Sequence, residues 1–559
     1  MRVAIRCRSC ADGRIATVLL AGLVIAMSAV AGRPPLRDGP VVWYEDDRRP
    51  IPVPDQYDPL PISSEIRATV SRPIGRALDP VRWLTGADGP AWNPNALGEV
   101  PGSTWFTNRM GLRRLTAEEL ATGPGREGPS RDGPWEIIGA KQGGVTMGFR
   151  IRDAAGQVWL LKFDPPEHPG QSIRAGVVSN LILHACGYNT PVDRVVVFDR
   201  DQLSLGVDAS LRTVRGTGEV RLTEANLDSV LQATDSVFDG RYHALASRFL
   251  DGIPLGPIRH QGTRPDDPND HVPHEHRREW RGLRVICAWI GHNDTKIQNT
   301  LAMYEGEPGA GHVAHYLLDF ASSLGTSGAE TFAKFNFEYG VDLPASLGRL
   351  ATLGLRRDVW QTMPWPTHLD EVAHFHSLHF DPRSWSPIYP NSAFANLTTE
   401  DGYWAAKIVS AFTDRDLRIM VEQGRYQDPR AVDWLVEHLG RRRDIIARTW
   451  FDEVAPLDFW TWDGAALSGH DLGLERGLYP VEETRYRARA RLVDERREGG
   501  AWSDWRALEG PVWSPDRAFD RTAGRFLAVQ FQVDRGRGWQ DPITVYVGPR
   551  SGRVVAVDR

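Results

Sequence analysis

The stretch HNDTKIQN, at residues 292–299, decides the fold class of this chain. It has the spacing H-x-D-x-K-x-x-N, and the stretch YLLDFA follows at residues 316–321. Together they offer a carboxylate for the proton of a nucleophile, a lysine for a transferring phosphoryl group, and an amide and a second carboxylate for a cation. Hard cations such as Mg²⁺ prefer oxygen ligands, and phosphoryl transfer is catalysed mainly by positioning and charge neutralisation. The pattern therefore indicates phosphoryl-transfer chemistry.

Four side chains of this pattern have expected roles. Asp294 is expected to take the proton from an attacking hydroxyl, as a general base does. Lys296 is expected to neutralise the phosphoryl group during transfer, so that Asp294 and Lys296 are the two catalytic candidates. Asn299 and Asp319 are the candidate metal ligands, because their oxygens suit Mg²⁺ or Mn²⁺.

A glycine-rich stretch and a strand lysine precede this pattern. GAKQGGVTMG, at residues 139–148, lies between two predicted strands, and Gly143, Gly144 and Gly148 would let backbone N–H groups approach an anion. Lys162 stands in the otherwise apolar strand QVWLLKF, where it is either a snorkelling edge residue or a phosphate ligand. These four residues are the candidates for nucleotide binding, and a plain hairpin turn is the alternative for the glycines.

The predicted elements change in character along the chain. Residues 134–250 follow the order strand, strand, strand, helix, strand, strand, with the helix over 173–185 and Gly187 at its end. The next third is mostly helical. The spacing of Thr413 and Asp416 predicts a helix start, and Asp428-Pro429 predicts another.

In order and content, the pattern resembles the protein-kinase-like superfamily, in which a β-rich N-lobe with a glycine loop and a strand lysine precedes a helical C-lobe. The similar members are divergent ones: the HipA-type, spore-coat CotH-type and secretory-pathway kinases. Residues 90–460 also resemble, more closely, a group of uncharacterised exported bacterial proteins, and this likeness implies no known activity. The superfamily resemblance, over 134–325, implies a two-lobed kinase-like domain that uses ATP or another nucleotide with Mg²⁺ or Mn²⁺.

Three departures from that family pattern are visible. Residues 172–187 contain no acid, whereas kinases place a glutamate on this helix to pair with the strand lysine. Lys162 would then either lack its partner or draw it from elsewhere, for example from Glu167. Ala321 replaces the final glycine of the metal-binding triplet, and Asn293 replaces an arginine that commonly docks a phosphorylated activation loop.

Two functions of different kinds remain open. The first is a phosphotransferase, with nucleotidyl transfer as a variant, acting on a protein, a glycan or a lipid head group. The second is a pseudokinase that serves as a binding or scaffold protein at the cell surface or in the periplasm. The near-balanced charge, 66 basic against 72 acidic residues and a net −6, argues against a dedicated nucleic-acid binder.

The expected fold is α+β, with five parts along the 559 residues. Arginines followed by an apolar run ending in Ala-Val-Ala predict a signal peptide over 1–31, with an uncleaved membrane anchor as the alternative. A Pro-rich extended arm is expected over 32–133, an N-lobe over 134–255 and a helical C-lobe over 256–455. Alternating residues predict a small antiparallel β domain of sandwich type over 465–559. The protein is therefore expected to be exported, to the periplasm or outside the cell.

Three smaller features have two interpretations each. The arginine row at 487, 489 and 491 is a solvated face or a binding stripe. The loop 271–276, which contains three histidines, is a surface loop or a zinc site. The stretch DFWTWD, at 458–463, is a linker on the C-lobe or a carbohydrate-stacking patch.

Cys186 and Cys287 are the two cysteines left after removal of the signal segment. The kinase-like resemblance places both near the contact of the N-lobe helix with the helix before residue 292. They are expected to be neighbours, either as free buried thiols or as a disulfide.

Overall fold

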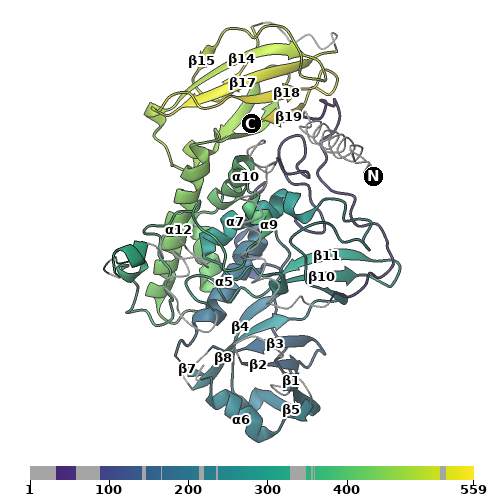
Figure 1. Ribbon diagram of the computed structural model, residues 1–559, viewed down its shortest axis with the longest axis vertical. Coiled ribbons are helices and arrows are strands. Elements are labelled where there is room, and N and C mark those ends of the chain that lie inside the picture. Colours follow the sequence, from purple (N-terminus) through teal and green to yellow (C-terminus); the bar gives the residue numbers. More distant parts are fainter. Residues whose placement is uncertain are drawn as a thin grey trace, which may run out of the picture.

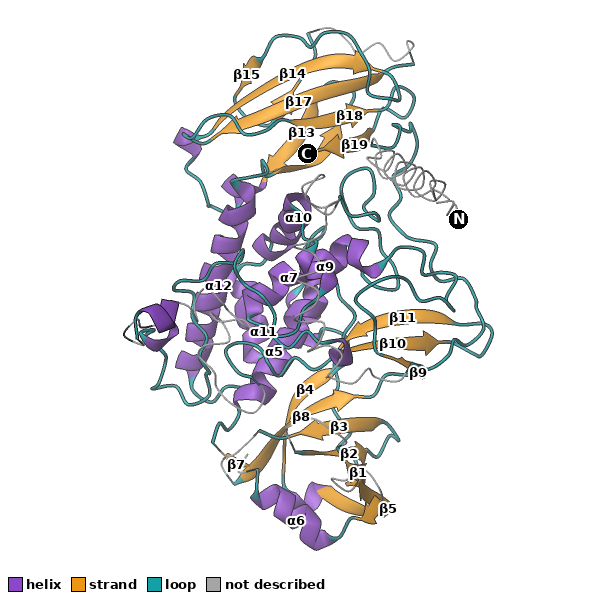
Figure 2. Cartoon of the chain, viewed as in Figure 1, coloured by secondary structure: helices purple, strands orange, loops and turns teal. Residues whose placement is uncertain are grey.

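The structure, a computed structural model, describes residues 33–57, 89–141, 147–164, 167–212, 219–234, 237–238, 240–327, 348–353, 355, 357, 359–516 and 524–559. These residues have a mixed α+β architecture (Figure 1). A mainly antiparallel sheet lies at one end, a group of helices at the centre and a second β region at the other end (Figure 2).

The first sheet has the strand order β4-β8-β3-β2-β1-β5-β6, with β7 paired to β8. Its central strands alternate between buried and less buried residues, so one face of the sheet is covered more closely than the other. The strands are β1 (Trp135–Ala140), β2 (Gly148–Arg152), β3 (Val158–Lys162), β4 (Asp193–Phe198), β5 (Leu203–Arg212), β6 (Glu219–Arg221), β7 (Val237–Phe238) and β8 (Arg241–Arg248).

Helix α5 (Gln171–Cys186) connects this sheet to the central helices. Every residue of α5 except His184 is buried, because the sheet covers one side and the helices cover the other. The opposite face of the sheet packs on α6 (Glu224–Gln232) in a separate core that includes Phe149 and Leu161. The predicted helix over 173–185 and its end at Gly187 are confirmed.

The segment from β5 to β7 was not predicted from the sequence. It inserts two strands, α6 and a short third strand between β4 and β8, and β5 pairs with β1 in parallel. Strands β6 and β7 have three and two residues, and the ten residues of β5 include Gly206 and Asp208, which weaken its alternation. Periodicity alone therefore carries little signal there.

The central region consists of helices and a three-stranded sheet with the order β11-β10-β9. Thr413 forms a capping box with Asp416, and Asp428 caps a helix that begins at Pro429, so both predicted helix starts are confirmed. The elements are β9 (Ile253–Gly256), α7 (Arg278–Ile290), β10 (Thr300–Glu305), β11 (His312–Leu317), α9 (Ser392–Ala395), α10 (Thr399–Ser410), α11 (Asp414–Glu422) and α12 (Pro429–Phe451).

The C-terminal region contains two antiparallel sheets that share one apolar core. One sheet has the order β12-β13-β16 and the other β15-β14-β17-β18-β19. The strands are β12 (Leu457–Trp462), β13 (Leu467–Asp471), β14 (Arg485–Val493), β15 (Arg506–Leu508), β16 (Val512–Trp513), β17 (Phe526–Asp534), β18 (Ile543–Val547) and β19 (Val554–Asp558). Residues 458–462 of the stretch 458–463 lie in β12, and Trp460 packs on Phe531 in the core, so the stretch is part of the C-terminal β region and not a linker.

The arginine row of β14 forms a stacked ladder with tryptophans. The guanidinium of Arg487 lies 4.2 Å from the ring centre of Trp539 and 4.6 Å from that of Trp505. Arg489 lies 4.4 Å from Trp505, and Arg491 continues the series. The row is therefore not a simple solvated face, because cation–π contacts hold it against the sheet.

The segment 33–57 links the C-terminal β region with the centre. Asp38 accepts hydrogen bonds from the backbone of Arg550 and Ser551, and Ile51 forms a bridge with Gly311. Residues 89–133 are more than an extended arm, since they contain helix α4 (Ala117–Thr122) and several side chains of the central core. Core side chains from this segment are Val100, Trp105, Phe106, Met110, Leu115 and Leu120.

The histidine-containing loop at 271–276 belongs to a polar network. His274 is buried, and its Nε2 lies 2.8 Å from a carboxylate oxygen of Asp270. His276 stacks on Trp92 with ring centres 4.2 Å apart. The described residues contain no group of three or more metal-ligating side chains that could hold an ion. The loop therefore anchors the neighbouring segments through His274 and His276, while His271 is exposed at the surface.

Cys186 and Cys287 are both buried and both unbonded. Burial raises the pKa of the Cys287 thiol well above its ordinary value, and the neighbouring Cys186 raises it further. Both cysteines belong to the central apolar core, to which α5 and α7 contribute, and the effect of Cys186 on Cys287 agrees with the expected proximity.

Among the described residues, none of the helices combines the length and the apolar character needed to cross a bilayer. The predicted signal peptide over 1–31 lies outside the described residues.

Candidate functional site

A β-hairpin brings the two halves of the sequence pattern together. Strands β10 and β11 pair in register from Thr300 opposite Leu317, directly after Asn299 and shortly before Asp319. The backbone N–H of Leu318 donates to the carbonyl of Asn299 at 2.8 Å. Residues separated by twenty positions in the sequence are therefore adjacent, because the hairpin returns the chain to its starting end.

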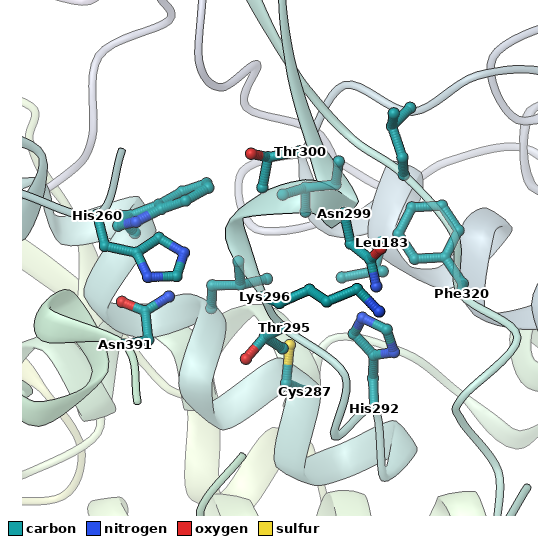
Figure 3. A pocket seen from close by; sticks show the side chains of 14 residues that line it. Leu183, His260, Cys287, His292, Thr295, Lys296, Asn299, Thr300, Phe320 and Asn391 are labelled. Atoms are coloured by element: carbon teal, nitrogen blue, oxygen red, sulfur yellow. The ribbon is translucent and has the colours of Figure 1, made fainter. Parts of the chain in front are cut away.

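The loop after α7 holds three of the predicted site residues in contact. Lys296 Nζ donates to Asp294 Oδ2 at 2.7 Å, and Asn299 Nδ2 donates to the same oxygen at 3.0 Å. The other oxygen, Asp294 Oδ1, is buried without a hydrogen-bond partner. Figure 3 shows Lys296 and Asn299 next to His292, whose ring nitrogen Nδ1 lies 3.1 Å from the carbonyl of Ser322. The loop thus holds Asp294 in one orientation.

Lys162 reaches this site from the first sheet. Its Nζ lies 3.0 Å from Asp319 Oδ1, and its side chain is 13% exposed against 41% for that of Asp319. The expected proximity of the two side chains is confirmed. Lys162 is therefore not a snorkelling residue at the sheet edge: β3 lies between β2 and β8, and the lysine points to the central region.

Asp319 has a backbone conformation that few residues adopt. Its φ is +55°, in the left-handed region, where aspartate is better tolerated than most residues. Helix α5 holds the segment that follows: the hydroxyls of Ser179 and Ser323 are hydrogen-bonded at 2.6 Å, and those of Ser172 and Thr326 at 2.7 Å. Such strain persists only where the surroundings enforce it, and it is common at functional sites.

Three lysines surround Asp319. Burial works to raise the pKa of Asp319, but Lys162, Lys141 and Lys296 together lower it to about 2. Burial and the nearby charge of Lys162 lower the pKa of Lys141 to about 8. Burial works to lower the pKa of Lys296, but the neighbouring Asp294 carboxylate outweighs burial and raises this pKa. Three ammonium groups facing two carboxylates form a site suited to a polyanion such as a nucleotide phosphate chain.

The glycine-rich stretch is described only in part. Gly143 and Gly144 lie outside the described residues. At Gly148, a Cβ atom would lie 2.1 Å from the carbonyl oxygen of Leu161 on the neighbouring strand. A glycine is therefore required at this position by the close approach of β2 and β3, and this contact accounts for it without a ligand.

The residues at this site fit a divalent cation that is shared with phosphates. Asp319 offers a partly exposed carboxylate, and the amide oxygen of Asn299 lies at the adjacent end of the hairpin. The amide nitrogen of Asn299 is engaged by Asp294, which leaves its oxygen as the possible ligand. Mg²⁺ commonly takes one or two protein oxygens and completes its shell with phosphates and water, so two protein ligands are sufficient.

Two residues near this site had no role in the sequence analysis. Lys141 directly follows β1, within the glycine-rich stretch 139–148, and Asp193 begins β4. A lysine next to a glycine-rich turn was a usable signal for Lys141. Asp193 left no such signal, because only the pairing of three strands brings it near Lys162.

Replacement of Lys141 by methionine is expected to change the pH dependence of nucleotide binding. Only protonated Lys141 attracts phosphates, and bound phosphates raise the pKa of a lysine. Wild-type affinity should therefore fall as pH rises above about 8, and Lys141→Met should bind more weakly below pH 8 and lose this fall. Calorimetric titrations between pH 7 and 9.5 measure both effects. An unchanged profile would remove Lys141 from the site.

A small internal cavity lies beneath the loop (Figure 3). Its volume is about 20 Å³, and it is lined by Lys296 and Asn299 of the charged site together with Cys287, Thr295, Asn391 and other residues of the core. This volume holds one water molecule, not a nucleotide. The cavity therefore adjoins the charged site but is too small to hold a nucleotide.

No family model matches the sequence, and no curated protein matches it. A solved structure, the crystal structure of the Golgi casein kinase, matches with 9% sequence identity and a TM-score of 0.28. The match covers 61% of this chain and 75% of that chain. At this similarity the roles of individual residues do not transfer from that protein, and the contacts of this chain alone support them.

Proposed function

We propose that this protein is an exported, atypical kinase-like phosphotransferase that moves a phosphoryl group from a metal-bound nucleotide to an acceptor. One observation carries the proposal. The ion pair of Lys162 with Asp319 joins the first sheet to the end of the hairpin, beside the Asp294–Lys296–Asn299 cluster. Phosphoryl transfer requires a base, phosphate-binding cations and metal ligands in one place, and the contacts bring together side chains that could fill these three roles.

The roles of the side chains follow from their positions. Lys162 and Lys141 attract and orient the phosphates from the sheet side, and Asp319 with Asn299 holds the cation. A bound Mg²⁺ supplies charge neutralisation at the phosphates. Asp294 accepts the proton of the acceptor hydroxyl, and Lys296, 2.7 Å from it, stabilises charge on the transferring group.

The absence of an acid on α5 favours a second candidate function, a pseudokinase that binds partners without turnover. The two functions differ in chemistry, not in nucleotide binding. Wild-type protein that binds a nucleotide with Mg²⁺ but yields neither phosphorylated protein nor free phosphate would favour the pseudokinase.

Nucleotide binding is tested by thermal-shift titration with ATP, GTP and ADP, each with and without Mg²⁺ or Mn²⁺. We expect wild-type protein to gain stability with a nucleotide plus metal, since a ligand that binds the folded state stabilises it. Asp319→Asn is expected to lower the metal-dependent affinity about tenfold or more, because the cation loses a charged ligand.

Asp433→Asn serves as the matched control, because Asp433 is an exposed carboxylate of α12 paired with Arg418. It should behave as wild type. Equal and metal-independent nucleotide affinity in wild type and Asp319→Asn would contradict the proposed function and the metal role of Asp319.

A further inference from the structure

The side of helix α5 that faces the site forms hydroxyl hydrogen bonds and close packing contacts instead of a salt bridge with Lys162. Ser172 and Ser179 bond to the segment after Asp319. Gly176 lies between them, and a Cβ there would come within 2.9 Å of Leu245 and 3.7 Å of the backbone nitrogen of Ala321. The helix therefore packs too closely on this segment to carry a long acidic side chain at that position, so any carboxylate beside Lys162 other than Asp319 has to come from another element.

Asp193, the first residue of β4, is on the same face of the sheet as Lys162. Strand β8 pairs with both neighbours: Ser247 is opposite Asp193, and Leu245 is opposite Lys162. Positions two apart on a strand share a face, and Leu245 packs in the core that contains α5. Asp193 and Lys162 thus both point toward α5, with one strand between them.

The carboxylate of Asp193 is incompletely satisfied by the protein. The residue is 3% exposed, and its Oδ1 has no hydrogen-bond partner. Burial raises the pKa of Asp193 to about 6, whereas hydrogen bonding by Ser247 and the charge of Lys162 work to lower it. The carboxyl is therefore mostly ionised at pH 7.5 and lies within electrostatic reach of Lys162.

The ionisation of Asp193 does not serve stability. Because its folded pKa lies above the ordinary value of 3.8, its ionised form is disfavoured in the folded protein. Ionisation therefore costs stability at neutral pH, and this cost is relieved as pH falls through about 6. An asparagine would fill the same space without this penalty, so the negative charge needs another explanation.

We propose that Asp193 is a positioning residue that balances the charge of Lys162 from β4 and replaces the acid that α5 lacks. This inference rests on the proposed function. Lys162 then lies between Asp193 and Asp319, and Asp193 weakens the hold of Lys162 on Asp319. Asp319 is thereby available to a cation while Lys162 turns to the phosphates.

The test is the metal dependence of nucleotide binding at pH 7.5, measured as the ratio of the ATP dissociation constants without and with Mg²⁺. Asp193→Asn removes one negative charge, so metal-free ATP should bind no more weakly and the cation should bind less well. We expect the ratio to fall about fivefold. The double variant Asn180→Asp/Asp193→Asn should restore it, since Asn180 on α5 adjoins Asp193 and would return the carboxylate.

Asp153→Asn is the matched control, because Asp153 is a buried carboxylate of the same sheet that bonds Trp159 and backbone N–H groups in the turn after β2. It should lower the melting temperature and leave the ratio unchanged. If Asp193 had only a structural role, Asp193→Asn would also lower the melting temperature and leave the ratio unchanged. This outcome would overturn the proposal.

A second measurement separates this inference from the proposed function. It measures the rate at which a small amine-reactive reagent modifies Lys162, and peptide mass spectrometry follows the reaction. This measurement requires no nucleotide. Asp193→Asn should raise this rate several-fold, because the loss of one neighbouring negative charge favours the neutral, reactive amine more than the remaining pair with Asp319 opposes it. The double variant should return the rate toward wild type. This result in a protein that binds no nucleotide would support the pairing and refute the proposed function. An unchanged rate in Asp193→Asn would refute the pairing whether or not ATP binds.

Discussion

Asp294→Asn is expected to lower turnover by a factor of about 10² to 10⁴, the usual contribution of a general base, while nucleotide affinity changes by less than about threefold. An asparagine side chain does not accept the proton of an attacking hydroxyl. Asp294 adjoins Asn299 and Lys296 but is not among the proposed metal ligands, so its charge matters for the transfer step more than for binding.

The measurement uses ATP labelled in its γ-phosphate, with the protein itself and water as acceptors. Labelled protein and free phosphate report turnover, and calorimetry reports binding in the same preparations. Asp433→Asn, the exposed control on α12, should retain wild-type rates. Turnover that persists in Asp294→Asn would show that another group takes the proton.

Lys407→Met is expected to have the largest effect on stability. Lys407 lies on α10, 3% exposed, and pairs with Glu99 and with Asp458 Oδ2 at 3.1 Å. Arg559 binds the same oxygen of Asp458 at 2.9 Å. Removal of one partner from a buried ion network leaves an uncompensated charge and destabilises by roughly 3–5 kcal/mol. The effect should reach both the central helices and the C-terminal β region, because the network joins them.

Melting temperature and urea denaturation measure this loss. Lys407→Met/Glu99→Gln should recover part of it, since Asp458 and Arg559 then remain as a balanced pair. The exposed pair of Arg126 and Glu118 provides the control: Arg126→Met should change stability by less than about 1 kcal/mol. If Lys407→Met and Arg126→Met lowered stability equally, this result would contradict the assigned role of the network.

The pH dependence of the Asp458 contribution to this network has a definite sign. Burial alone would raise the pKa of Asp458, but Arg559 and Lys407 lower it to about 2. Its stabilising contribution is therefore complete above the ordinary value of 3.8 and is lost as pH falls toward 2.

Local sequence determined the elements and the site residues that occur in one segment. Helical spacing and caps identified α5, α11 and α12, because these signals lie within a few residues of one another. The spacing from Asp294 to Asn299 was equally local, since one loop holds them.

Only tertiary structure decided which distant groups meet. The return of the hairpin placed Asp319 beside Asn299, and the pairing of β3, β8 and β4 brought Asp193 to the face of Lys162. The missing acid of α5 was visible in the sequence, but its replacement was not. Contacts between residues far apart in the chain depend on strand register and on packing, which no local periodicity encodes.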